Sequence, residues 1–140
     1  EVITVGGSNK SFLTLNETGA TTANGSATTF TSVSSTTFGV GTDDIISESS
    51  HTFIAYCFAE KKGYSKFGSY KGNGDNDGIF IYTGFKPAWV LTRQTNGGNY
   101  WHIHDNRRNA FNVRNTQLKA GDTAADETPS GGENSKDFVS

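Results

Sequence analysis

The sequence is short of several residue types on which whole classes of protein depend. It contains no methionine, two prolines and a single cysteine, Cys57, in 140 residues. One cysteine excludes an intrachain disulfide framework, and its position inside the apolar run 51–59 predicts a small buried side chain rather than a reactive thiol. No stretch of about 18 apolar residues is present, so the sequence predicts no membrane insertion.

Charge of one sign and catalytic motifs are equally scarce. The formal net charge is −2, with acids and bases interspersed, which is unlike the basic stripe that nucleic-acid binding requires. There is no Gly-x-Ser-x-Gly elbow, no phosphate-binding loop and no strand with the alternating acids that glycoside cleavage would need. We therefore expect a protein that is not an enzyme, uses no cofactor and binds no nucleic acid.

What the sequence does contain is aromatic side chains, at 12% of residues, in a chain whose apolar fraction is 33%. They occur in short segments about ten residues apart, separated by Gly, Asn and Pro, which is typical of an all-β antiparallel sandwich or jelly roll. Thr52–Ala59 is apolar at both alternating sets of positions, and this pattern predicts a central strand covered on both faces. The other expected strands are 12–15, 36–40, 64–70, 79–82, 89–93, 100–104 and 111–113, with a hairpin turn at 96–98.

The two ends of the chain resemble each other. Phe12–Leu15 and Thr116–Leu118 are each followed by a polar stretch rich in Thr, Ala and Gly. If the two are equivalent places in a repeat of about a hundred residues, the chain holds parts of two tandem modules of a longer polypeptide. Residues 1–71, with closing strand 52–59, are then the back half of one module. Residues 72–140 are the front half of the next, and the halves either pack as one sandwich or are completed by another chain.

Two features suggest a metal site, and each has a simpler explanation. His102 and His104 share one face of an expected strand and could bind a metal, or they face solvent or a neighbouring sheet while Trp101 and Ile103 pack inside. The Gly-Asp-Asn-Asp-Gly run 74–78 resembles the start of a calcium loop, but no Glu follows at the spacing that an EF-hand needs. These residues are also those that a tight turn prefers, so we predict no metal site.

Three loops hold the candidate ligand-binding residues. Asn, Asp and Gly beside aromatic rings are typical of sugar-binding surfaces, and we expect them in the loops 72–78, 94–99 and 105–109. Asp105 and Arg108 either bind an anion or close a turn by pairing with each other, the second being favoured. Any ligand contact is then expected from Asp75, Asp77, Asn96, Asn99 and Arg107, with Trp101 and Arg108 structural.

Long segments of this chain resemble a known family. They are FIAYCFAEKKGYSKFGSYKGNG at 53–74, GIFIYTGFKPAWVL at 78–91 and YWHIHDNRRN at 100–109. Together they resemble a module common in marine bacteriophage structural proteins, which recurs in tail-fibre and related virion proteins as a domain of unassigned function. The resemblance covers about residues 50–118 and implies a concanavalin-like β-sandwich, often in tandem, on a virion surface.

These features lead to an expected function. The chain would be a non-enzymatic structural and adhesive module of a phage tail fibre or virion appendage, located extracellularly at the virion surface. Its expected partners are further copies of itself or other virion subunits, together with a host surface glycan. Repeated copies would multiply weak contacts through avidity. A glycan-binding lectin domain and a purely architectural spacer are the alternatives.

Overall fold

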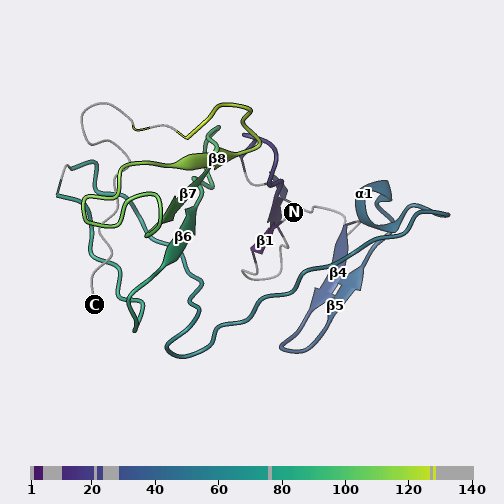
Figure 1. The fold of residues 1–140 in the computed structure, drawn as a ribbon. Helices are drawn as coiled ribbons and strands as arrows, with labels where there is room; N and C mark the ends of the chain where they lie inside the picture. Colours follow the sequence, from purple (N-terminus) through teal and green to yellow (C-terminus); the bar gives the residue numbers. More distant parts are fainter. Residues whose placement is uncertain are drawn as a thin grey trace. The chain divides into compact units, whose positions relative to one another are not determined.

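The computed structural model describes residues 2–4, 11–20, 22–23, 29–75, 77–126 and 128. The chain divides into two compact units, which are described separately below. Figure 1 shows that the described elements are short strands and one single-turn helix. Unit 1 comprises Glu1–Tyr56, Arg93–Trp101 and Ala120–Asp122, and unit 2 comprises Cys57–Thr92, His102–Lys119 and Thr123–Ser140.

The first sheet of unit 1 contains the strands β1 (Val2–Thr4), β2 (Ser11–Leu13) and β3 (Thr22–Ala23). Strand β2 lies in the middle and pairs antiparallel with both neighbours. Its Leu13 is only 3% exposed and belongs to the small apolar core. The strand expected over 12–15 is therefore present, although it begins and ends earlier than the pattern predicted.

A separate two-stranded sheet in unit 1 pairs β4 (Phe30–Val33) with β5 (Phe38–Val40) in antiparallel register. The ring of Phe30, which is buried, meets that of Phe38 edge-on, with the centroids 6.4 Å apart and the planes at 67°. Such edge-to-face contacts are the arrangement that aromatic quadrupoles favour. The turn between the strands is held by Ser34, whose Oγ accepts hydrogen bonds from the amides of Thr36 and Thr37.

The single helix, α1 (Asp44–Ser47), follows β5 and begins at a defined cap. The carboxylate of Asp43 accepts hydrogen bonds from the amide of Ile45 (3.1 Å) and from the hydroxyl of the buried Thr29 (2.7 Å). A side-chain oxygen at this position satisfies an amide that has no partner inside the helix. The Thr29 hydroxyl, and then the Ile45 amide, lower the pKa of Asp43 below its ordinary value.

The third sheet contains β6 (Trp89–Thr92), β7 (Trp101–Asp105) and β8 (Leu118–Ala120), with β7 in the middle. Strands β6 and β7 pair antiparallel, with Trp89 opposite Asp105 and Thr92 opposite His102. This confirms the strands expected over 89–93 and 100–104 and the hairpin between them. At the end of β8, Gly121 has a φ of 84°, and a Cβ there would lie 2.8 Å from the carbonyl of Asn16.

Trp101 is the best-anchored side chain of unit 1. It is 5% exposed, and its indole nitrogen donates a hydrogen bond to the carbonyl of Thr14 (3.0 Å). The guanidinium of Arg93 lies 5.9 Å from the ring centroid, and its Nη2 donates to the carbonyl of Gly19. A large ring with its one polar atom satisfied stabilises a core, so the expected structural role of Trp101 agrees with its surroundings.

Four expected strands are absent from the described structure. Segments 52–59, 79–82 and 111–113 form no strand, and of 64–70 only Ser65 pairs, in an isolated bridge to Lys61. In Figure 1 the chain between α1 and β6 is drawn without an arrow or a coil. The prediction that 52–59 is a covered central strand is wrong for the single chain. An apolar run forms a strand only where a second strand supplies backbone hydrogen-bonding partners, and no described strand pairs with 52–59.

The exposure of this region corrects a second prediction. Cys57 is exposed, not buried, because the backbone on either side of it packs against no described sheet. The all-β, antiparallel character of the chain is confirmed, and the assembly of its sheets into a sandwich stays a prediction. Among the described residues three apolar side chains are buried, whereas eighteen large ones are exposed, so little apolar surface is covered within one chain.

Candidate functional site

The described residues of the acidic loop 72–78, among which Asn76 is not included, are linked by their own side chains. Asn73 Oδ1 accepts a hydrogen bond from the amide of Asp75 (3.2 Å), and Asp75 Oδ1 accepts one from the amide of Asp77 (3.2 Å). Asn73 also donates to the carbonyl of Asp77 (2.9 Å). These are the local bonds by which Asx side chains form turns. Across the described part of the chain no three His, Cys, Asp or Glu side chains come together as metal ligands.

The two candidate asparagines lie in the connection between β6 and β7. Asn96 Oδ1 accepts a hydrogen bond from the side-chain amide of Gln94 (3.3 Å), and Asn99 donates its backbone amide to the carbonyl of Thr18 (3.1 Å). Both residues belong to unit 1, whereas Asp75, Asp77 and Arg107 belong to unit 2. The structure therefore does not bring the five predicted ligand-binding residues together in one unit.

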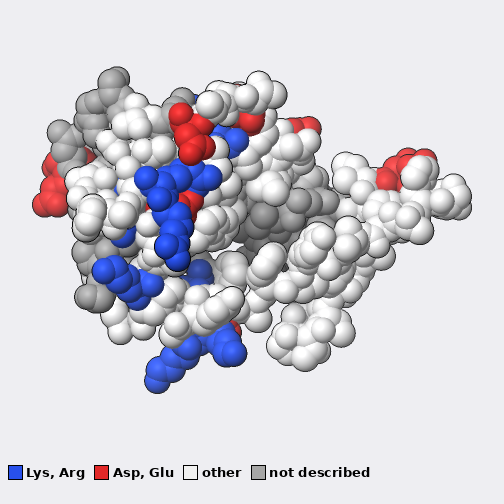
Figure 2. All heavy atoms as spheres, in the orientation of Figure 1, with Lys and Arg blue, Asp and Glu red and all other residues white. Residues whose placement is uncertain are grey.

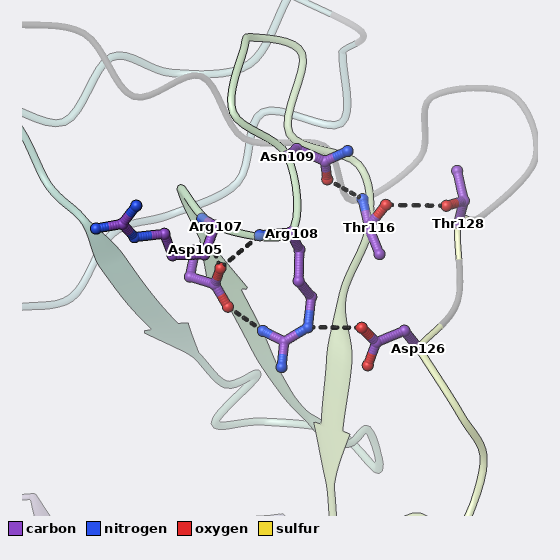
Figure 3. A network of polar contacts seen from close by, with 7 residues as sticks. All are labelled: Asp105, Arg107, Arg108, Asn109, Thr116, Asp126 and Thr128. Atoms are coloured by element: carbon purple, nitrogen blue, oxygen red, sulfur yellow. Dashed lines mark hydrogen bonds and ion pairs between the residues drawn. The ribbon is translucent and has the colours of Figure 1, made fainter.

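Asp105 and Arg108 close the turn that follows β7. Asp105 Oδ1 accepts hydrogen bonds from the amides of Arg107 (2.8 Å) and Arg108 (2.9 Å), while its Oδ2 pairs with the Arg108 guanidinium. Arg108 Nε also pairs with Asp126 (2.8 Å). Figure 3 shows Arg108 between the two carboxylates and Arg107 pointing away from them. The structural interpretation of Asp105 and Arg108 agrees with these contacts.

The same network lowers the pKa of Asp105. The backbone amide of Arg108 is the largest cause that lowers the pKa of this carboxyl below its ordinary value of 3.8, and the Arg107 amide and the Arg108 charge lower it further. Nearby, the side chain of Asn109 accepts a hydrogen bond from the amide of Thr116 (2.8 Å). A carboxylate that accepts several hydrogen bonds is held in its charged form, so Asp105 is a structural acid and not a proton donor at neutral pH.

The two histidines of β7 differ in burial. His104 is completely buried, and His102 Nδ1 lies 2.8 Å from Oε1 of the buried Gln117. The solvent-facing alternative is thus wrong for His104, whereas packing against a neighbouring sheet stays a prediction. A buried imidazole packed beside a paired strand is the arrangement of a structural residue, and no third ligand for a metal is placed beside the two among the described residues.

A pocket in unit 2 was not predicted from the sequence. It has a volume of about 350 Å³, and three aromatic side chains form much of its wall. Two of these, Phe58 and Tyr64, are 80% and 78% exposed. Gly63, with a φ of 75°, lies in the turn between Lys61 and Ser65, a conformation that glycine adopts without strain. The pocket is lined by Cys57, Phe58, Ala59, Glu60, Lys61, Tyr64, Ser65 and Phe67.

The polar groups of this pocket are largely used within the loop itself. The two carboxylate oxygens of Glu60 accept hydrogen bonds from the Phe67 amide (3.0 Å) and from Lys66 Nζ (3.1 Å). Ser65 Oγ donates to the carbonyl of Ala59 (2.7 Å) and accepts from the Lys61 amide (2.9 Å). The Phe67 amide, and after it Lys66, lower the pKa of Glu60 below its ordinary value.

These bonds fix the loop 59–67 as a rigid frame for exposed rings. Its sequence signal was a Glu followed five residues later by a Ser, with a glycine between, which is too common to single out. Around it the surface carries mixed charge, and Figure 2 shows Lys and Arg side chains in small groups, among larger areas of uncharged residues. The arrangement offers ring faces and scattered charges, so it is suited to binding.

The fold and the site define a class of protein: an all-β antiparallel chain with an exposed aromatic segment and, among its described residues, no assembled metal centre. A family model, "Domain of unknown function (DUF7483)", matches residues 2–140, and the chain belongs to this family. No curated protein matches the chain, and no solved structure does. No helix in the described residues is long and apolar enough to cross a membrane.

Proposed function

We propose that this chain is a non-enzymatic structural and adhesive module that works in an assembly of several copies. The observation that carries the proposal is the distribution of its apolar side chains. Eight of the eighteen exposed large apolar residues lie in the stretch of unit 2 from Phe58 to Tyr82. Soluble monomers rarely expose apolar patches of more than a few hundred Å², and larger ones mark interaction surfaces. A neighbouring subunit in an assembly would cover this surface.

The location that fits such a module is a virion surface, in a tail fibre or related appendage. The support is the resemblance of residues 53–91 and 100–109 to modules of marine bacteriophage structural proteins. Fibres are built from repeated subunits, and repeated copies convert weak contacts into firm attachment. In this proposal the exposed loop residues Asp75, Asp77 and Arg107 face outward and are available to a host surface glycan.

The oligomeric state of the purified chain tests the proposal. Sedimentation velocity from low to high micromolar concentration is expected to show a reversible shift from monomer to a larger species. A chain that sediments as a monomer over the whole range, without aggregation, would contradict the assembly role. Screening against an array of polysaccharides for reducing-end release tests the non-enzymatic part, and any saccharide-specific release would overturn it.

A glycan-binding lectin domain is the second candidate, and the pocket lined by Phe58, Tyr64 and Phe67 is the observation in its favour. Aromatic faces cover the C–H patches of sugar rings. A glycan array would support this candidate if it gave a saccharide-specific signal that is lost in Tyr64→Ser. The same array run with Asp75→Ala and Asp77→Ala would show whether the acidic loop contributes.

A further inference from the structure

We propose that the pocket of loop 59–67 receives an aromatic side chain of the 79–82 stretch from a second copy of this chain. The inference rests on the proposed function and names the contact that would build the assembly. Three observations on residues of unit 2 carry it. The first is the exposure of the aromatic rings at the pocket and in 79–82. The second is that polar groups of the pocket are hydrogen-bonded within their own loop. The third is the presence of charged side chains beside the pocket and beside the 79–82 stretch.

The area of exposed rings matches what an interface requires. Six aromatic side chains of the segment from Cys57 to Tyr82 are half or more exposed, with Phe80 at 74% and Tyr82 at 79%. At about 200 Å² for each aromatic side chain, they leave roughly 800 Å² in contact with water. This is close to the roughly 800 Å² that each partner contributes to a specific interface of standard size. The six are Phe58, Tyr64, Phe67, Tyr70, Phe80 and Tyr82.

The chemistry of the pocket favours an apolar occupant over a saccharide. A sugar needs hydrogen-bonding groups to recognise its hydroxyls. The Glu60 carboxylate already accepts hydrogen bonds from the Phe67 amide and Lys66. The Ser65 hydroxyl is already bonded to the Ala59 carbonyl and the Lys61 amide. Apart from the Lys61 ammonium group and the Tyr64 hydroxyl, the pocket offers the faces of Phe58, Tyr64 and Phe67. Ring faces with few free hydrogen-bonding groups beside them suit another aromatic side chain.

The charges that accompany these rings are complementary between two copies. Lys61 lines the pocket and Lys62 follows it, and the ammonium group of neither has a partner among the described residues. The incoming stretch 79–82 follows directly on the loop that carries Asp75 and Asp77. A ring entering the pocket would therefore bring two acids near two lysines, which steers association and selects the partner.

A contact of this kind is reciprocal. Each copy has both the pocket and the 79–82 stretch, so two copies can insert into each other around a two-fold axis and form a closed dimer. The uncharged stretch Ile79–Tyr82 would then be covered in the dimer, as would the pocket.

The test measures self-association of the full chain by sedimentation equilibrium. The double variant Phe80→Ser/Tyr82→Ser is expected to weaken dimerisation by about a hundredfold or more, because interface aromatics are common hot spots. Phe111→Ser is the matched control, since Phe111 is 84% exposed in the same unit but lies outside the segment. Far-UV circular dichroism and the fluorescence of the two tryptophans verify that each variant is folded. Equal dimerisation of the double variant and the control would overturn the proposal.

A charge-reversal cycle tests the orientation of the contact. Asp77→Lys and Lys61→Asp are each expected to weaken dimerisation about threefold to tenfold at low salt, and the combined variant should recover most of the loss. Cys57 lines the pocket and is the only thiol, so its rate of alkylation should fall as the protein concentration rises. Additive losses in the combined variant, or an alkylation rate independent of concentration, would contradict the contact.

The outcomes separate this inference from the proposed function. If the wild-type chain never associates, both fail. If it associates as strongly with Phe80→Ser/Tyr82→Ser as with Phe111→Ser, the inference alone fails and assembly uses another surface. A glycan signal that is lost in Tyr64→Ser, with association unchanged, would assign the pocket to a saccharide and overturn the inference.

Discussion

The hairpin of β6 and β7 and the segment from Thr52 to Tyr82 both contain many aromatic residues, yet they differ in structure. In the hairpin, Trp89–Thr92 pairs with four residues of β7, and β8 adds a third strand. The segment 52–82 contains a single isolated bridge among the described residues. A backbone in β conformation gains stability when a neighbouring strand satisfies its amides and carbonyls, so the pattern alone is insufficient.

The largest effect on stability is expected from substituting one of the two tryptophans of the hairpin and not the other. Trp101→Ala removes a buried ring and the bond from its indole to the Thr14 carbonyl, and we expect a loss of about 3–5 kcal/mol in the free energy of unfolding. Trp89 is 55% exposed, and Trp89→Ala should cost well under 1 kcal/mol, as is usual for surface residues. Urea unfolding followed by circular dichroism measures both. Similar losses in the two variants would contradict the difference in burial.

The next effect compares adjacent arginines in the turn after β7. Arg108→Ala breaks the pairs with Asp105 and Asp126, and we expect a loss of about 1–2 kcal/mol in the free energy of unfolding. Arg107→Ala is the matched control, because only its backbone amide takes part in the network, and it should change stability by less than about 0.5 kcal/mol. If Arg107→Ala lowered the free energy of unfolding as much as Arg108→Ala, the loss would come from removing a positive charge and not from breaking the hydrogen-bond network.

A smaller effect depends on pH. Because the pKa of Asp105 is lowered in the folded chain, its contribution to stability is fully present above the ordinary value of 3.8 and is lost as the pH falls through the folded pKa. We therefore expect the stability difference between wild type and Asp105→Asn to shrink between pH 5 and about pH 2. Urea midpoints along this range measure it, with Asp75→Asn as a control for removal of an exposed loop charge. A difference that stays constant with pH would contradict the assignment.

The smallest effect on stability is expected in the segment that forms no strand. Cys57→Ala should change the free energy of unfolding by no more than about 0.5 kcal/mol, because the side chain is exposed. At low micromolar concentration the thiol of the native wild type should react with a maleimide nearly as fast as in urea. Protection by a factor of a hundred or more under these conditions would place Cys57 in a core and restore the strand predicted over 52–59.

The sequence predicted the hairpin well and the segment before it poorly, for one physical reason. Residues 89–93 and 100–104 are close along the chain and are joined by Asn96-Gly-Gly98, so the turn itself brings the two strands together. Thr52–Ala59 is also strongly apolar, but its partner must come from far along the chain or from another chain. The sequence pattern predicts which residues favour a strand, but it does not predict which other strand pairs with them.

The candidate site also has one part that could be predicted from the sequence and one part that could not. The turn formed by Asp105 and Arg108 could be predicted because the residues are three apart and their chemistry is local. The pocket of loop 59–67 could not, because it depends on how Glu60 and Ser65 fold back on the Phe67 amide and the Ala59 carbonyl. The burial of His104 was left open too, since period-two alternation assigns a face to a residue but does not say how well that face is covered.

By itself, the sequence determined the all-β class, the two strands of the central hairpin, the turn residues and the lack of a catalytic motif, because each depends on neighbours a few positions apart. The tertiary structure alone decided that Trp89 is exposed, that Cys57 lies at the surface, and that three exposed rings line a pocket. Burial is a property of what packs against a residue, and those partners lie far away in the sequence.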